Sequence, residues 1–312
     1  MALPSGTFTT YSAIGQREDL EDRIYNIAPT DTPGLSSFAR VDASAVLHEW
    51  QTDTLASAAA NAVLEGDDAT TDSATATTRL SNTCQISDKV PRVTGTMEAV
   101  SKAGRKSELA YQVAIRAKEL KRDMENDIFA NVAENTGSAT VARTYGAMPS
   151  WITTNTSNGT SGTDGSAGNT ARTDGTQRAF SETLLKTVLQ DIWTNGGDPD
   201  VIMLGAFNKR ALSAFSGNAT REINATEKRL VTSIEVYESD WGVIKVVPNR
   251  FSRSRDALIL ELKFWALAYL RPFRLYDLAK TGDSERKQLL VEWTLVSRNE
   301  KASGGVFDLT TS

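Results

Sequence analysis

The sequence predicts an α+β fold, and two observations support this prediction. Residues 109–128 place apolar side chains every three or four positions, which is the repeat of one face of an α-helix. Other stretches, LHEWQTDTL and LLVEWTLVSRN among them, alternate apolar and polar residues as β-strands do. Helices are thus interspersed with strands that we expect to be mostly antiparallel, which is the α+β arrangement.

The N-terminal 45 residues are predicted to form an extended arm. Residues 18–27 could form a short helix, but the next stretch, IAPTDTP, holds two prolines. Proline removes an amide donor and favours extended backbone before it, so this stretch is not helical. Because such an arm cannot bury itself well, we expect it to contact another molecule.

Residues 46–100 have the pattern of a long hairpin. LHEWQTDTL and TCQISDKVPRVTGTMEAV are strand-like, and a stretch rich in Ala, Thr, Ser and Asp lies between them. Loops longer than about 12–15 residues are uncommon unless they are functional. This arrangement predicts a hairpin arm rather than part of a compact core.

The strongest helix prediction begins after Ser107, a suitable N-cap, and extends to about Val132. Its apolar face is made by Leu109, Val113, Ala117, Leu120, Met124 and Ile128. The other faces are charged, and they are either solvated or in contact with a neighbouring subunit.

The second half of the chain begins with a low-complexity stretch, residues 153–176. We expect no residue in it to anchor a core, so it is predicted to be a mobile surface excursion. After it come an amphipathic helix at 180–193, a buried strand VIMLG, and a hairpin that turns at Asp240-Trp241-Gly242. Further strands are expected in ALILELKFWALAYLRPF, LLVEWTLVSRN and VFDLT.

Composition excludes several classes of protein. The chain has 312 residues, 40% of them hydrophobic, which is enough to bury a core, and no apolar run approaches the length of a membrane helix. Its net charge of −5 is not the basic excess of a nucleic-acid-binding protein. A single cysteine, Cys84, and a single histidine, His48, exclude a disulfide framework and a Cys/His zinc cage. We interpret His48 as an ordinary strand residue and Cys84 as a small packed thiol.

No motif in the sequence assembles a catalytic site. The carboxylates of Glu65, Asp67, Asp68 and Asp72 lack the spacing of a calcium loop, and Gly196-Gly197 is not followed by the Lys-Ser/Thr of a phosphate loop. The charged stretch 280–287 is either a solvated hairpin tip or an intersubunit ion-pair patch. We therefore predict an assembly protein with no enzymatic activity, no cofactor and no metal.

A set of short motifs then points to a family. They run in this order: MALPSGTF, REDLEDRIYNIAPTDTP, HEWQTDTL, LEGDD, KAGRKSELAYQ, KELKRDME, TDGTQRAF, GNATR, KVVPNRF, AYLRPF, DLAKTGD and GGVFDLT. Together they resemble tailed-phage major capsid proteins, whose shells have the Hong Kong 97-type fold.

The resemblance implies a division of the chain into named parts. These are an N-terminal arm (1–45), an extended hairpin called the E-loop (46–96), a P-domain with a long spine helix (97–148), a flexible surface loop (149–180), an A-domain (181–264), P-domain strands with their tip (265–298) and a C-terminal segment (299–312). Candidate assembly contacts are Asp67, Arg79, Arg271, Lys280, Asp283 and Arg286.

The resemblance also implies a function. The chain would assemble into hexamers and pentamers of an icosahedral shell that encloses double-stranded DNA without sequence-specific binding. Its partners would be further copies of itself, the portal, and cement (decoration) and scaffolding proteins, with no membrane. It would be assembled in the host bacterial cytoplasm and reside in the virion capsid. The alternatives are a bacterial nanocompartment shell of the same fold, which encloses enzymes, and a hydrolase that uses carboxylates.

Overall fold

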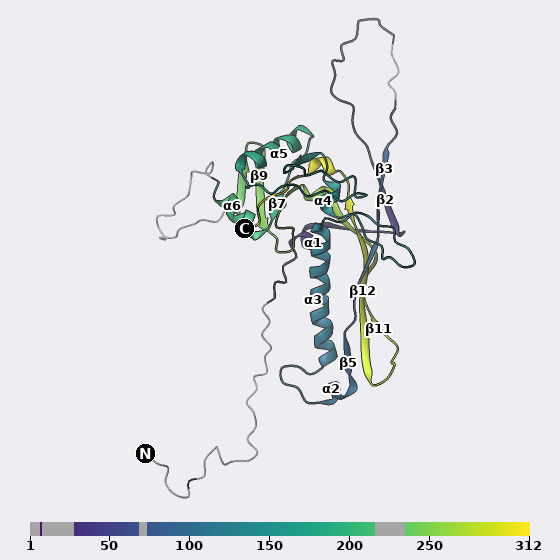
Figure 1. The fold of residues 1–312 in the computed structure, drawn as a ribbon. Helices are drawn as coiled ribbons and strands as arrows, with labels where there is room; N and C mark the ends of the chain where they lie inside the picture. Colours follow the sequence, from purple (N-terminus) through teal and green to yellow (C-terminus); the bar gives the residue numbers. More distant parts are fainter. Residues whose placement is uncertain (1–6, 8–27, 69–73, 216–234) are drawn as a thin grey trace.

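The computed structural model describes residue 7 and residues 28–68, 74–215 and 235–312. Most of the predicted N-terminal arm, including the short helix expected at 18–27, lies outside the described residues. The described chain forms a body from which one long hairpin projects (Figure 1). No helix in this part of the chain is both long and apolar enough to cross a membrane.

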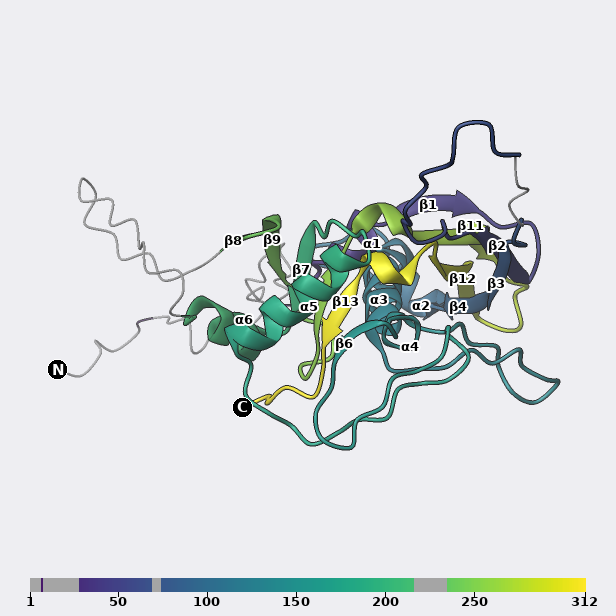
Figure 2. The same cartoon turned by 90° about the horizontal axis from the view of Figure 1, so that it is seen from above.

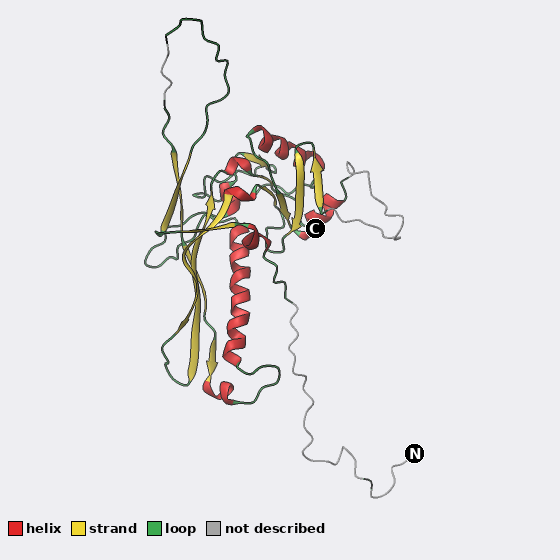
Figure 3. Cartoon of the chain, turned by 180° about the vertical axis from the view of Figure 1, so that it is seen from behind, coloured by secondary structure: helices red, strands yellow, loops and turns green. Residues whose placement is uncertain are grey.

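A long helix and a long β-hairpin form one half of the body. Helix α3 (Glu108–Phe129) runs beside β11 (Trp265–Asp277) and β12 (Ser284–Ser297), as Figures 1 and 3 show. The sheet has the order β1-β11-β12-β4, where β1 (Ala39–Asp42) is parallel to β11 and β4 (Gln85–Lys89) is antiparallel to β12. A short strand, β5 (Arg92–Thr94), pairs with the start of β12.

The predicted helix is confirmed, with one difference at its end. The Ser107 hydroxyl accepts a hydrogen bond from the amide of Ala110, so Ser107 is the N-cap. The helix ends at Phe129 rather than near Val132, because Ala130 takes an extended conformation. Its 22 residues make it about 33 Å long. Leu120, Met124 and Ile128 are fully buried against the sheet.

The other half of the body is a six-stranded sheet of order β6-β13-β10-β7-β9-β8. Its strands are β6 (Asn155–Ser157), β7 (Val201–Leu204), β8 (Val236–Ser239), β9 (Gly242–Pro248), β10 (Ala257–Leu260) and β13 (Gly304–Val306). The hairpin predicted around Asp240-Trp241-Gly242 is β8–β9, and the run VIML is β7, so both predictions are confirmed.

The central strand β7 joins the two halves, because it is buried on both faces. Val201 and Met203 face the core shared with α3, whereas Ile202 and Leu204 face a second core under helix α5 (Glu182–Thr194). Burial on both faces explains the continuous apolar run in the sequence. A short helix, α6 (Ala206–Ser213), follows β7. Figure 2, from above, shows the connections on either side of α4 (Met148–Trp151) running along one side of the body.

A buried carboxylate fixes the point where the N-terminal segment joins the body. Glu125 of α3 is fully buried and accepts hydrogen bonds from the amides of Gly34 (2.8 Å) and Leu35 (2.7 Å), in helix α1 (Pro33–Ser37). The Asn249 amide donates a third bond, at 2.7 Å. Gly34 packs so closely on Phe129 that a Cβ would lie 2.7 Å from the ring.

We expect Glu125→Ala to lower the free energy of unfolding by about 3 kcal/mol or more, because it leaves three buried hydrogen-bond donors without their acceptor. Glu125→Gln, the matched control, keeps one acceptor oxygen and is expected to cost less. Urea unfolding measures both. An alanine variant that unfolds at the wild-type midpoint would contradict the assignment of Glu125 as the tie between α1 and α3.

Candidate functional site

A two-stranded ribbon leaves the body and carries a long exposed connection (Figure 1). In it β2 (Leu47–Thr52) pairs antiparallel with β3 (Thr78–Thr83), and Trp50 lies opposite Leu80. The described residues between the strands are exposed and have no regular structure apart from one turn. The first strand and the long connection expected from the sequence are therefore present, but the expected second strand was wrong. The strand that returns to pair with β2 is 78–83, most of which the sequence pattern assigns to the connection, whereas residues 85–94 supply β4 and β5, which pair with β12, and residues 95–99 form a helix. We call residues 47–83 the hairpin arm.

The connection between the two strands carries exposed apolar and acidic side chains. Leu55, Val63 and Leu64 are 99%, 70% and 81% exposed, although large apolar side chains gain free energy from burial. Residues 53–78 contain five carboxylates and no lysine or arginine. Large apolar side chains this exposed, on a segment that projects from the body, are expected where another molecule covers them.

The two candidate contact residues on the hairpin arm differ in their surroundings. Arg79 forms an ion pair with Glu49 across the ribbon, so it already has a partner in its own chain. Asp67 is exposed near the far end and accepts a hydrogen bond from the amide of Asp68.

Three more candidates lie at the other end of the molecule, where β11 turns into β12. Lys280 is 3.6 Å from Glu285, and the Arg286 guanidinium donates to the carbonyl of Ala279 and the hydroxyl of Thr281. The carbonyl of Asp283 accepts from the amide of Gly95, at the start of helix α2 (Gly95–Ala99).

Arg271 is held within its own chain. Its Nε lies 2.6 Å from Glu292 Oε2, and Arg143 reaches the other oxygen of the same carboxylate at 2.7 Å. It sits where the pairing of β11 with β12 shifts register, beside Pro272. The structure therefore spreads the six candidates over three places and does not bring them into one site.

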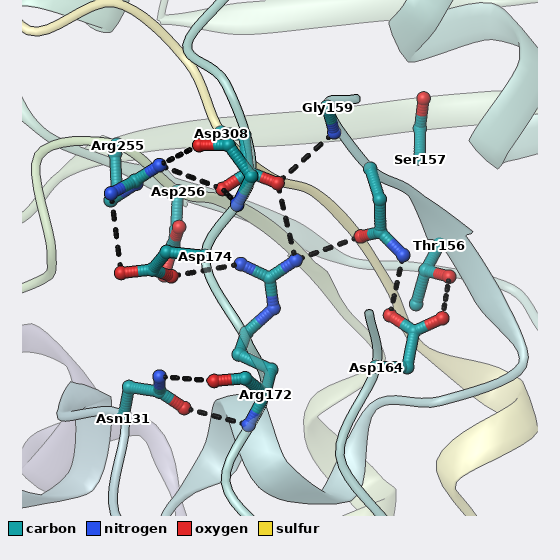
Figure 4. A network of polar contacts seen from close by, with 12 residues as sticks. Asn131, Thr156, Ser157, Gly159, Asp164, Arg172, Asp174, Arg255, Asp256 and Asp308 are labelled. Atoms are coloured by element: carbon teal, nitrogen blue, oxygen red, sulfur yellow. Dashed lines mark hydrogen bonds and ion pairs between the residues drawn. The ribbon is translucent and has the colours of Figure 1, made fainter. Parts of the chain in front are cut away.

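The prediction that residues 153–176 form a mobile surface excursion without anchors is wrong, because side chains in this segment are buried in the body. They are polar rather than apolar, which is why a search for apolar anchors missed them. Arg172 is 3% exposed, and its guanidinium stacks over the Phe307 ring at 3.8 Å (Figure 4). Its backbone exchanges two hydrogen bonds with the Asn131 side chain. Asn155 is also fully buried.

Asp308 is the second centre of this network (Figure 4). Its carboxylate accepts from the amides of Gly159 and Gly175, from Arg255 at 2.9 Å, and lies 3.6 Å from Arg172. Burial alone would raise the pKa of Asp308, but these donors outweigh it and leave the pKa below its ordinary value. The network thus ties the 153–176 segment to the C-terminal residues.

Asp256 has the opposite behaviour in the same network. It is 1% exposed and pairs with Arg253 at 3.0 Å, but its second oxygen has no hydrogen-bond partner in the structure. Burial raises its pKa to about 6. The sequence held one local signal for this network, the charged run from Arg250 to Asp256, but nothing in it pointed to residue 172 or 308.

The two residues considered for reactivity are structural. His48 is a half-buried strand residue whose ring centroid lies 5.9 Å from that of Trp50, and burial lowers its pKa. Cys84 is fully buried, and burial raises its pKa to about 11, so its thiol is inert. Both interpretations are confirmed. Within the described ranges, no three His, Cys, Asp or Glu side chains gather as metal ligands would.

Comparison with known proteins decides the family. Residues 3–310 match the SU10 major capsid protein family. The chain belongs to this family of phage major capsid proteins. The capsid protein is also similar to the major capsid protein of Escherichia phage Phieco32, with 26% identity in an alignment that covers 98% of each chain. The resemblance inferred from the sequence motifs is therefore confirmed.

Solved structures agree on the fold. The capsid protein is similar to a chain of the cyanophage A-1(L) capsid asymmetric unit, with a TM-score of 0.70 and 15% identity over 95% of this chain and 98% of that one. A chain from the structure of phage G gp27 major capsid proteins and gp26 decoration proteins matches with a TM-score of 0.54 and 10% identity, over 99% and 100% of the two chains. The mixed helix and sheet fold is thus that of phage capsid structures.

The pKa of Asp256 predicts a pH dependence of stability. The pKa of Asp256 is raised from 3.8 in the unfolded chain to about 6 in the folded chain. Protonated Asp256 therefore stabilises the folded chain below pH 3.8, and this contribution to the unfolding free energy is lost as the pH rises through about 6. Between about pH 4 and pH 7, the unfolding free energy of the wild type should fall by about 2 kcal/mol relative to Asp256→Asn. Urea unfolding across this range measures it, and parallel pH profiles would refute it.

Proposed function

We propose that this capsid protein builds the icosahedral shell of a tailed phage from hexamers and pentamers, and that the shell encloses double-stranded DNA. The observation that carries the proposal is the hairpin arm, because three large apolar side chains in the connection between its strands are left uncovered by the described part of their own chain. Burial of such side chains against a second copy would add contact area that the body alone does not offer.

The parts of the chain fit the Hong Kong 97-type division in this proposal. The hairpin arm serves as the E-loop, and α3 with the β11–β12 hairpin serves as the P-domain. The six-stranded sheet with α5 serves as the A-domain, and residues 1–45 serve as the N-terminal arm. Support comes from the long helix beside a long hairpin, the separate second sheet, and the likeness of the whole chain to phage capsid structures.

Partners and location follow from the same proposal. The shell would be assembled in the host bacterial cytoplasm with a portal at one vertex, and with scaffolding or decoration proteins where the phage encodes them. The structure of the phage G relative contains decoration proteins, which supports that kind of partner. The net charge of −5 suits a wall that encloses DNA without gripping it.

We expect the triple variant Leu55→Ser, Val63→Ser, Leu64→Ser to fold normally and to lose shell assembly. Exposed positions cost little in the isolated subunit, whereas the apolar contact with a neighbour would be gone. Electron microscopy counts shells and urea unfolding measures the subunit. The matched control, Ala56→Ser, Ala58→Ser, Ala60→Ser, adds the same number of hydroxyls to the same arm and should assemble.

The wild-type particles test the function itself. Shells that contain DNA would support it, shells filled with enzyme cargo would favour a nanocompartment, and the absence of shells would contradict it. Normal shells from the triple serine variant would show that the apolar end of the hairpin arm is not the contact.

We also expect the subunits to remain unlinked by covalent bonds. A covalent link through a lysine amine would need a lysine near the exposed end of the arm. The only lysine in residues 46–96 is Lys89, which lies on β4, far along the chain from that end. Its amine pairs with Asp123 of α3 at 2.6 Å. The buried thiol of Cys84 offers no alternative. A denaturing gel of mature particles should give one band near 33.8 kDa. A ladder of larger bands that survives boiling and reductant would overturn this expectation.

A further inference from the structure

In the part of the hairpin arm that the structure describes, attachment to the body is found only near the base of the arm. Among the described residues, its side-chain hydrogen bonds to the body involve Trp50, Asn82 and Thr83. Burial along β3 decreases away from the body, from the buried Asn82 and Thr83 to the exposed Thr78 and Arg79. Neither arm strand joins the hydrogen-bonded ladder of the two main sheets. The direction in which the arm projects therefore depends on few contacts.

Trp50 supplies the first of these contacts. Its indole N–H donates to the carbonyl of Ser297 at 2.8 Å, and its ring packs on Trp151 with centroids 5.4 Å apart. Trp50 and its cross-strand neighbour Leu80 are partly buried against the core shared with α3. Farther out, the ribbon has no partly buried contact with this core among the described residues.

Asn82 supplies the second contact and uses its amide almost completely. It is fully buried, accepts from the amide of Gly146 at 2.8 Å, and donates to the carbonyls of Gly146 and Leu295 at 3.1 and 2.8 Å. An asparagine has two donors and one carbonyl oxygen, so both donors and the acceptor are engaged.

The position of these bonds on β12 explains why side chains are needed. Strand β4 pairs with β12 only as far as Trp293, so Leu295 and Ser297 lie past the end of that pairing. The arm turns away from the sheet there, at Cys84, between β3 and β4. Side chains of the arm thus bind carbonyls that a continued ladder would have paired.

We propose that Trp50 and Asn82 are positioning residues that set the direction of the hairpin arm relative to the body. Together they clamp the base of the ribbon to the open end of β12 and to Gly146. The inference rests on the proposed function for the use of the arm in assembly. The direction of the arm itself can be measured in the unassembled chain, so the two ideas fail separately.

The test measures the distance between spin labels on the full-length chain in dilute solution. Labels are placed at Thr78→Cys, at the outer end of the ribbon, and at Lys118→Cys, on the exposed side of α3. The native Cys84 is fully buried and remains unlabelled. We expect one narrow distance peak in the otherwise unchanged chain. Trp50→Ala and Asn82→Ala should each lose that narrow peak.

Two further variants separate positioning from general stability. Trp50→Phe keeps an aromatic ring against Trp151 but removes the N–H that bonds Ser297, and it should broaden the peak partially even if Trp50→Ala fails to fold. Glu49→Gln breaks the ion pair within the ribbon and should leave the peak narrow. Variants that unfold at lower urea but keep the narrow peak would overturn the proposal. If variants lose the narrow peak and still assemble normally, Trp50 and Asn82 set the direction of the arm, but assembly does not depend on that direction.

Discussion

The hydrophobic core between α3 and the β11–β12 hairpin is the interaction on which the rest of the structure depends. Leu120, Met124 and Ile128 bury one side of the helix against Val291 and Trp293 of the hairpin. The same core takes one face of the six-stranded sheet, which would otherwise be a separate unit. The two sheets and α3 therefore share one body, to which the described peripheral segments are attached.

Those peripheral segments place few apolar side chains against the core, Leu35, Phe38 and Trp50 among them, and each is also held by a buried polar side chain. Glu125 accepts hydrogen bonds from α1, and Asn82 of the hairpin arm donates to β12. Arg172 and Asp308 attach the 153–176 segment. Such groups are costly to bury unless their hydrogen bonds are complete, so they specify one geometry more strictly than apolar contacts would. The network around Asp308 is not complete, because one oxygen of Asp256 and the Nε atoms of Arg172 and Arg255 are buried without a hydrogen-bond partner in the structure. Burial raises the pKa of Asp256 to about 6.

This division suits a shell protein of the kind we propose. A rigid body gives each subunit the same shape, and the exposed apolar side chains on the hairpin arm are left for contacts with other copies. Arg271 and Arg286, by contrast, are engaged inside their own chain, Arg271 with the buried carboxylate of Glu292 and Arg286 with the carbonyl of Ala279 and the hydroxyl of Thr281.

The sequence by itself determined the local elements and the family. The period of residues 109–128 and the hydroxyl of Ser107 predicted the long helix, and motifs along the whole chain identified the capsid family. Alternation predicted several strands, β2 and β12 among them, but not β3. Only the tertiary structure decided which hydrogen bonds the buried polar side chains form, because their partners are remote in sequence. Asn82 and Leu295 are 213 positions apart, and Gly34 and Glu125 are 91 apart. Low complexity hid the role of Arg172, since a buried charge is recognisable only once its distant carboxylates surround it.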